Sequence, residues 1–149
     1  MAGAASHSEA GDGAQLLLTL ANDREGFDRT RLAVLQHLAP HGASQQLLFK
    51  VELILEETLM NVIWHAFPDN EVHPITMSVQ VEPEDIVMHF EDDGMAFDPL
   101  LAPAPKLPTS IEKAVPGGLG LMLVRKYARS VAYERRAGRN CLTVRVART

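Results

Sequence analysis

The sequence predicts an α/β two-layer sandwich, in which a mixed, largely antiparallel sheet carries helices on one face. Three observations support this fold class. Two consecutive helical patterns precede two strands joined by a short turn, and one more helix is followed by a closing hairpin. That order contains too few strand–helix–strand crossovers for a doubly wound parallel sheet. The 149 residues suit one domain, and a hydrophobic share of 46% is enough to form its core.

The first 13 residues, MAGAASHSEAGDG, are small and polar and offer little to bury. We therefore expect a disordered tail over residues 1–13 and one folded domain over residues 14–149. A short strand is expected at about Gln15 to Ala21. A first helix is expected next, because apolar residues recur at helical spacing: Phe27, Leu32, Leu35 and Leu38. This helix is expected to end near Pro40.

A long central helix is expected to begin at Gln45, directly after Ser44, which is a good N-cap residue. Pro68 and the two residues after it end this helix after about 22 residues. Its apolar stripe is wide and consists of Leu47, Leu48, Val51, Ile54, Leu55, Thr58, Leu59, Val62 and Ile63.

The second half of the chain is expected to form most of the sheet. Two β runs, residues 75–81 and 86–92, flank a segment with the composition of a hairpin turn. Residues 99–116 hold five prolines and are long for an ordinary loop, which predicts a functional lid. A helix at about 119–129 and a hairpin of strands 131–135 and 141–147 complete the fold.

Charge is unevenly distributed along the chain. The net charge of -5 argues against a general affinity for nucleic acid. Eight of the 14 Lys and Arg residues nevertheless fall between Arg125 and Thr149, where Glu134 is the only acid. This basic quarter is either a solvated helix end with a surface hairpin or a docking site for an acidic partner.

The single cysteine, Cys141, cannot form a disulfide within the chain, which is typical of a reducing compartment. The longest early apolar run, residues 16–21, lacks a basic flank and is far shorter than the roughly 20 residues of a membrane span. We therefore expect a cytoplasmic protein without a membrane segment.

Polar residues interrupt the apolar surface of the central helix. Glu57 and Asn61 are four residues apart, so they share one helix face, and apolar residues flank that face on both sides. Polar groups in such a position are costly unless a partner satisfies them. They either bind something in a pocket or form a local hydrogen bond between side chains one turn apart.

Two further motifs stand where elements end or begin. Asp92, Asp93 and Gly94 follow a strand, and this pattern is either a turn or part of a site. Residues 117–121, GGLGL, begin a helix, where free backbone N–H groups can bind phosphate or where glycine serves only packing. The motif lacks the lysine of a P-loop and does not follow a strand in a βαβ unit.

Together, in this order and at these separations, the three motifs resemble the GHKL ATPase superfamily. Within it the chain is most similar to the compact anti-sigma factor type serine/threonine kinases of bacterial partner switching. Residues 57–66 resemble the asparagine box of that family, residues 92–99 its first glycine box and residues 117–121 its second. The resemblance covers about residues 15–146 and implies the Bergerat-type ATP-binding fold. Because no phosphoacceptor-histidine helix or membrane sensor precedes the motifs, we do not expect a complete sensor histidine kinase.

The resemblance implies a role for each motif. Asn61 would be the metal ligand, holding the Mg²⁺ that also binds the nucleotide phosphates. Glu57 would be the catalytic base that accepts the proton of the attacking hydroxyl. The expected ATP-binding residues are Asn61, Asp92, Gly94, Phe97, Gly117, Gly118, Leu119, Gly120, Leu121 and Thr143.

The same resemblance divides these residues between the two ends of ATP. Asp92 would accept a hydrogen bond from the adenine amino group, and Gly94 would let the backbone approach the base. Thr143 is expected on the adenine side. The glycines of residues 117–121 would present N–H groups to the phosphates. The lid cations, Lys106 and Lys113, would either reach the terminal phosphate or stay solvated.

The resemblance implies that the protein transfers a phosphoryl group from Mg²⁺-bound ATP. The acceptor would be a serine or threonine on a small STAS-type (anti-anti-sigma) antagonist. When not so engaged, the protein would bind a sigma factor or a similar regulator, and a homodimer is suggested. The alternative is a nucleotide-dependent binding module that sequesters its partner without phosphoryl transfer. Glu57 favours the kinase, whereas a lid without arginine favours the module.

Overall fold

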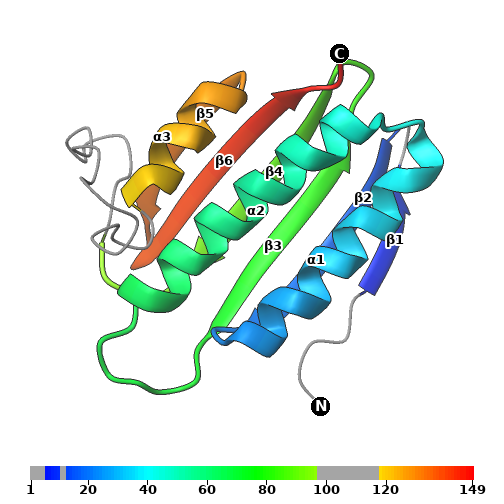
Figure 1. Cartoon of the computed structure of the whole chain (residues 1–149). Helices are drawn as coiled ribbons and strands as arrows, with labels where there is room; N and C mark the ends of the chain where they lie inside the picture. The colour runs from blue at the N-terminus through cyan, green and yellow to red at the C-terminus, as the bar shows by residue number, and fades with distance from the viewer. Residues whose placement is uncertain (1–5, 11–12, 97–117) are drawn as a thin grey trace.

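The computed structural model describes residues 6–10, 13–96 and 118–149 of the chain. Its strands form one six-stranded sheet in the order β1-β2-β3-β4-β6-β5, and every pairing among them is antiparallel. Three helices lie on one face of this sheet (Figure 1). The predicted two-layer sandwich is therefore confirmed. The predicted lid, residues 99–116, lies outside the described residues.

Apart from β1 and η1, which the sequence did not predict, the elements follow the predicted order with small shifts at their ends. Their bounds are β1 Ser6–Ala10, β2 Gly13–Ala21, α1 Arg24–Leu38, η1 Ala39–His41, α2 Gln45–His65, β3 Pro74–Val81, β4 Asp85–Asp92, α3 Gly118–Tyr127, β5 Ser130–Arg136 and β6 Arg139–Ala147. None of the helices in the described part of the chain is both long and apolar enough to cross a membrane.

Strand β1 corrects one expectation. It lies within residues 1–13, where the sequence predicted a disordered tail, and it pairs along β2 from Ser6 opposite Leu17 to Ala10 opposite Gly13. Pairing at a sheet edge needs only backbone N–H and C=O groups, so a polar segment can form a strand without burying side chains. The prediction considered only side chains that could be buried.

Helix α2 begins and packs as predicted. The Ser44 hydroxyl accepts a hydrogen bond from the Leu47 N–H at 3.1 Å, which satisfies one free donor of the first turn. The apolar stripe of the helix then lies against the sheet and is almost fully buried: Leu47, Val51, Ile54, Leu55 and Leu59. Helix α2 lies over the middle of the sheet (Figure 1), and its residues Thr58 and Asn61 line a pocket together with residues of β4 and β6.

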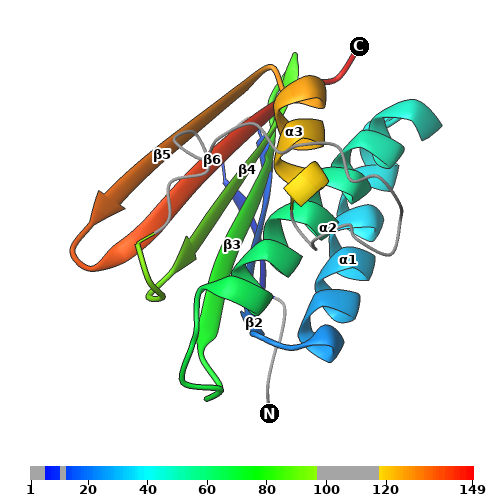
Figure 2. The ribbon, with the colours of Figure 1, turned by 60° about the vertical axis from the view of Figure 1, so that its left-hand side comes forward.

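The two faces of the sheet differ in chemistry. Alternate strand residues point to the helices and are buried: Leu16, Leu18, Ile75, Met77, Val79, Ile86, Met88, Phe90, Val144 and Val146. The residues between them point to the opposite face, where Figure 2 shows no helix among the described elements. We call this side the open face, and its middle is polar, with Thr76, Ser78, His89 and Glu91.

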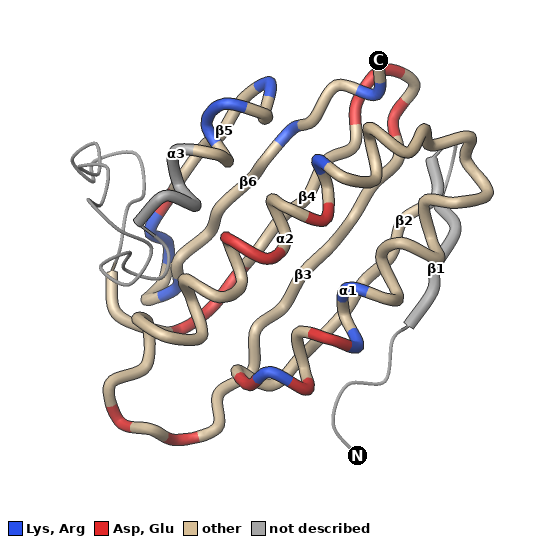
Figure 3. The backbone as a smooth tube through the Cα atoms, viewed as in Figure 1, with Lys and Arg blue, Asp and Glu red and all other residues tan. Residues whose placement is uncertain are grey.

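The basic quarter is largely paired within the molecule. Its residues lie along β5, β6 and the end of α3 (Figure 3). Arg145 contacts both Glu82 at 2.9 Å and Asp85 at 3.6 Å, and Arg129 contacts Asp85 at 3.0 Å. Arg148 donates to the carbonyl of His41. These arginine side chains therefore hold the 82–85 turn and the end of η1 against the C-terminal part of the chain.

Candidate nucleotide-binding site

Helix α2 presents the two polar residues that the sequence singled out. Asn61 is buried, with 9% of its surface exposed, and no hydrogen bond to its side chain is found among the described residues. Glu57 lies one helical turn earlier and is partly buried. Burial, followed by the nearby charge of Glu56, raises the pKa of the Glu57 carboxyl above its ordinary value.

A pocket lies between the C-terminal half of α2 and the helix-facing side of strands β4, β5 and β6. It joins Asn61 to Asp92, two residues that are 31 positions apart in the sequence and were assigned to the two ends of one nucleotide. Most of its wall is apolar, as expected where a base is held between side chains. Its full lining is Thr58, Asn61, Val62, His65, Ala66, Phe90, Asp92, Tyr133, Asn140 and Leu142.

The turn after β4 fixes the position of Asp92. One carboxylate oxygen of Asp92, Oδ1, accepts a hydrogen bond from the Gly94 N–H at 2.9 Å. The next residue, Met95, donates its N–H to the Ala66 carbonyl at the end of α2, also at 2.9 Å. A Cβ on Gly94 would lie only 2.6 Å from that carbonyl oxygen. Glycine is therefore needed for the chain to pass the end of α2.

Asn140 completes this network from β6, and the sequence did not predict it. Its Nδ2 donates to Asp92 Oδ1 at 3.0 Å and to the Met95 carbonyl at 2.8 Å. Its Oδ1 accepts from the Tyr133 hydroxyl and from Arg135, at 3.1 Å for the latter. Asp92 Oδ1 thus has two donors, while no hydrogen bond reaches Asp92 Oδ2 from the described residues.

Thr143 is not where the sequence placed it. It lies on the open face, where its hydroxyl contacts His89 Nδ1 at 2.9 Å, and it does not line the pocket. Successive strand residues point to opposite faces, so a position three residues along from Asn140 must face away from Asp92. The structure therefore does not bring Thr143 to the pocket, and the residue of β6 next to Asp92 is Asn140.

Thr58, which the sequence analysis counted in the apolar stripe of the helix, adds a polar hydroxyl to the pocket. The residue is 5% exposed, and its hydroxyl has no hydrogen-bond partner in the described structure. A helical threonine commonly bonds the carbonyl four residues earlier, as Thr30 does to Gly26 at 2.8 Å. The Thr58 hydroxyl is therefore left for a ligand or water in the pocket that it lines.

The second glycine motif lies where α3 begins. Gly118, Leu119, Gly120 and Leu121 form the first turn of this helix, which packs beside α2 (Figure 2). The first turn of a helix has N–H groups without helical partners. Phe97 and Gly117, like the lid lysines Lys106 and Lys113, lie outside the described residues.

Comparison with known proteins identifies the family of the chain. Residues 20–146 match the model of a family described as the histidine kinase-like ATPase domain. The chain is also 35% identical over 111 residues to the serine/threonine-protein kinase BtrW of Bordetella bronchiseptica. The aligned region covers 74% of this chain and 78% of that protein. The predicted resemblance to GHKL proteins is confirmed, and the chain belongs to the histidine kinase-like ATPase family.

Proposed function

We propose that this chain is an ATP-dependent serine/threonine protein kinase of the partner-switching type. It phosphorylates a small STAS-type antagonist and, when not so engaged, binds a sigma factor or a similar regulator. Its similarity to a serine/threonine-protein kinase supports phosphoryl transfer as the reaction. The observation that carries the proposal is that Asn61 and Asp92 line one pocket, with Glu57 one helical turn before Asn61 on α2.

The residues of the site fit a magnesium ion beside Asn61. Mg²⁺ prefers oxygen ligands, keeps several waters and takes few ligands from the protein. Asn61 offers a carboxamide oxygen, is buried and has no side-chain hydrogen bond within the described residues. When bound, the ion would neutralise phosphate charge. Asn61 would hold it on the α2 side of the pocket.

Glu57 acts as the base in this proposal. Helical geometry places its Cα about 6 Å along the axis from that of Asn61 and on the same face, so both side chains serve one substrate. A general base works best when its pKa approaches the operating pH. Partial burial moves the pKa of Glu57 upward, in that direction. The proton of the attacking hydroxyl would pass to its carboxylate.

Asp92 and Asn140 select the base. Asn140 and Gly94 both donate to Asp92 Oδ1, which fixes the carboxylate plane. Oδ2 is then available to accept from the adenine amino group. The apolar walls contributed by Phe90 and Leu142 would exclude water from that bond.

Replacing Asn61 with alanine should remove the Mg²⁺-dependent part of ATP affinity and leave a weaker part that does not depend on the metal. Calorimetry with and without Mg²⁺ measures both parts. Asn61→Asp is the matched control, because it keeps an oxygen ligand and should retain the magnesium effect. If the difference between the two conditions survives in Asn61→Ala, Asn61 is not the ligand.

Replacing Thr58 with valine should weaken ATP binding without lowering the stability of the nucleotide-free protein. The change removes a buried hydroxyl that has no partner among the described residues, which is neutral or stabilising. Thr30→Val is the control, since it breaks a real hydrogen bond and should cost about 1 kcal/mol. Thermal unfolding with and without ATP tests both. A loss of stability in Thr58→Val would contradict the assignment.

The alternative is a module that binds its partner in a nucleotide-dependent way without transferring phosphate. The absence of arginine from residues 99–116 favours it, because arginine is a common stabiliser of a transferred phosphate. Incubation with γ-labelled ATP, Mg²⁺ and a candidate antagonist from the same cell separates the two. The kinase labels a serine or threonine of the antagonist. Nucleotide-dependent binding without label supports the module, and no ATP binding would exclude both.

A further inference from the structure

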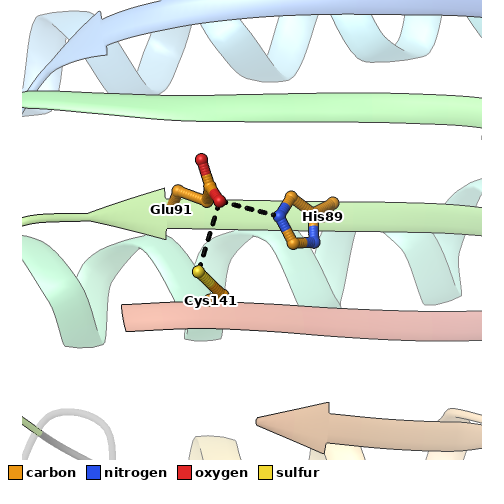
Figure 4. A group of neighbouring side chains, drawn as sticks. All are labelled: His89, Glu91 and Cys141. Carbon is orange, nitrogen blue, oxygen red and sulfur yellow. Dashed lines mark hydrogen bonds and ion pairs between the residues drawn. The ribbon is translucent and has the colours of Figure 1, made fainter. Parts of the chain in front are cut away.

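Three side chains with metal-binding chemistry meet on the open face, away from the nucleotide pocket. His89 and Glu91 are alternate residues of β4, so they project from the same face of the sheet. Cys141 of β6 pairs directly with Glu91 in the antiparallel register. Figure 4 shows the three side chains converging, with the Glu91 carboxylate between the other two.

The distances between these groups suit a tetrahedral metal centre. Cys141 Sγ lies 3.2 Å from Glu91 Oε1, and His89 Nε2 lies 3.4 Å from the same oxygen. One ligand atom from each residue falls within 4.8 Å of the other two. Zinc bonds of about 2.0 Å to nitrogen and oxygen and about 2.3 Å to sulfur give tetrahedral edges of about 3.3–3.6 Å. Small side-chain adjustments would therefore bring all three atoms onto one ion.

The orientation of His89 is set by a second residue. Its Nδ1 contacts the Thr143 hydroxyl at 2.9 Å, and Thr143 pairs with His89 across the two strands. In metal sites, the ring nitrogen that does not bind the ion is commonly held by such a hydrogen bond, which fixes the tautomer and ring plane. Here that hydrogen bond leaves Nε2 facing Glu91 and Cys141. Thr143 would thus orient the His89 ring for metal binding.

We propose that His89 Nε2, Glu91 Oε1 and Cys141 Sγ bind Zn²⁺ or a chemically similar divalent transition metal. Thiolate, imidazole and carboxylate are the ligand types that zinc prefers, and three of them leave the fourth position to water. The thiolate and carboxylate together balance the charge of the ion. The thiol proton of Cys141 leaves to solvent when the sulfur coordinates.

Solvent access and the nearby arginines are compatible with an ion. His89 and Glu91 line a hollow of about 470 Å³ on the open face, which provides an entry path. Arg139 approaches the other carboxylate oxygen, Oε2, at 3.9 Å and can stay there. Arg136 is 3.7 Å from Oε1, but its side chain is 62% exposed and can turn into solvent.

The site would cross-link the strands that build the nucleotide pocket. Glu91 precedes Asp92 on β4, and Cys141 follows Asn140 on β6. A metal on the open face would thus hold β4 and β6 together at the level where Asp92 bonds Asn140 on the other face. The proposal does not depend on the kinase function, because it rests only on groups of the open face.

Cobalt titration of the reduced, metal-free full-length chain tests the site. Cys141 is the only cysteine, so a thiolate-to-cobalt charge-transfer band in the near ultraviolet can come only from its sulfur. The band should saturate at one Co²⁺ per chain and disappear when Zn²⁺ is added. Cys141→Ser and Cys141→Ala should both abolish it, and His89→Gln should weaken cobalt binding by about 10-fold or more.

His73→Gln is the matched control. His73 contacts two carboxylates, Asp69 at 2.8 Å and Asp93 at 3.7 Å, but it lies apart from the cysteine, so its loss should leave the band unchanged. Thermal unfolding without metal verifies that each variant folds, and Zn²⁺ should raise the melting temperature of the wild type and not of the Cys141 variants. A wild type without the band, or a band that His89→Gln leaves unchanged, would overturn the site.

Discussion

Glu57→Gln is expected to leave ATP affinity nearly unchanged while phosphoryl transfer to the antagonist slows by about 10²- to 10⁴-fold, the usual contribution of general acid–base catalysis. Glutamine keeps the size of the side chain and its place on α2, so the pocket lined by Asn61 and Asp92 is not disturbed. It cannot accept the proton of the attacking hydroxyl. Single-turnover transfer and calorimetric ATP binding, measured on the same preparation, separate the two effects.

The same substitution should stabilise the nucleotide-free protein at neutral pH. Burial raises the pKa of Glu57 in the folded state above its unfolded value, so ionisation costs folding free energy. The wild type therefore loses stability as the pH rises from the unfolded pKa through the folded pKa, and Glu57→Gln does not. The stability difference should vanish at pH values below the unfolded pKa and reach a plateau above the folded pKa.

Glu56→Gln is the matched control for both measurements. Glu56 is the preceding residue on the same helix but is exposed, and its charge is the smaller of the two causes that raise the pKa of Glu57. Its removal should therefore change transfer by less than about twofold and alter stability little. If Glu57→Gln lost ATP binding and transfer in equal proportion, or melted at a lower temperature than the wild type, Glu57 would be a structural residue. The base would then have to be sought elsewhere.

Local patterns predicted the elements because their signals are themselves local. The Ser44 cap, the apolar stripe of α2 and the prolines that end the helices each act within a few residues. The helical spacing of Glu57 and Asn61 was therefore enough to place both on one face. Strand β1 was missed because edge pairing depends on backbone groups, which leave no pattern in the side chains.

The adenine end of the site could not be derived in the same way. Which residue of β6 lies beside Asp92 depends on the strand register, and a change of one residue reverses the face to which each side chain points. The register pairs Asp92 with Asn140 and His89 with Thr143, so the two residues serve opposite faces. The sequence pointed to Thr143, which lies on the expected strand, β6, but on the open face rather than the face of the pocket. The asparagine at the start of a strand was the available signal.

Asp92→Asn is expected to weaken ATP binding and to narrow the preference for ATP over GTP, which should be about 10² or more in the wild type. Adenine offers an amino group at the position where guanine has a carbonyl oxygen. In the wild type the carboxylate attracts the first and repels the second within an apolar pocket. Competition of ATP and GTP for one fluorescent nucleotide gives the ratio for each variant.

The hydrogen bonds around Asp92 determine how the new amide would sit. Gly94 N–H and Asn140 Nδ2 both donate to Oδ1, so the asparagine oxygen should occupy that place and its NH₂ group should take the place of Oδ2. The amide would then oppose the adenine amino group, donor against donor, and would donate to the guanine oxygen. The ATP to GTP ratio should fall by about 10-fold or more while the turn at Gly94 is kept.

Asp93→Asn provides the comparison for this switch. Asp93 is the next residue, its side chain is 47% exposed, and it contacts His73 at 3.7 Å rather than lining the pocket. Its replacement removes the same charge one position away and should leave the nucleotide ratio unchanged. If Asp92→Asn lowered only the melting temperature and kept the ratio, its carboxylate would serve the turn alone. The adenine assignment would then be withdrawn.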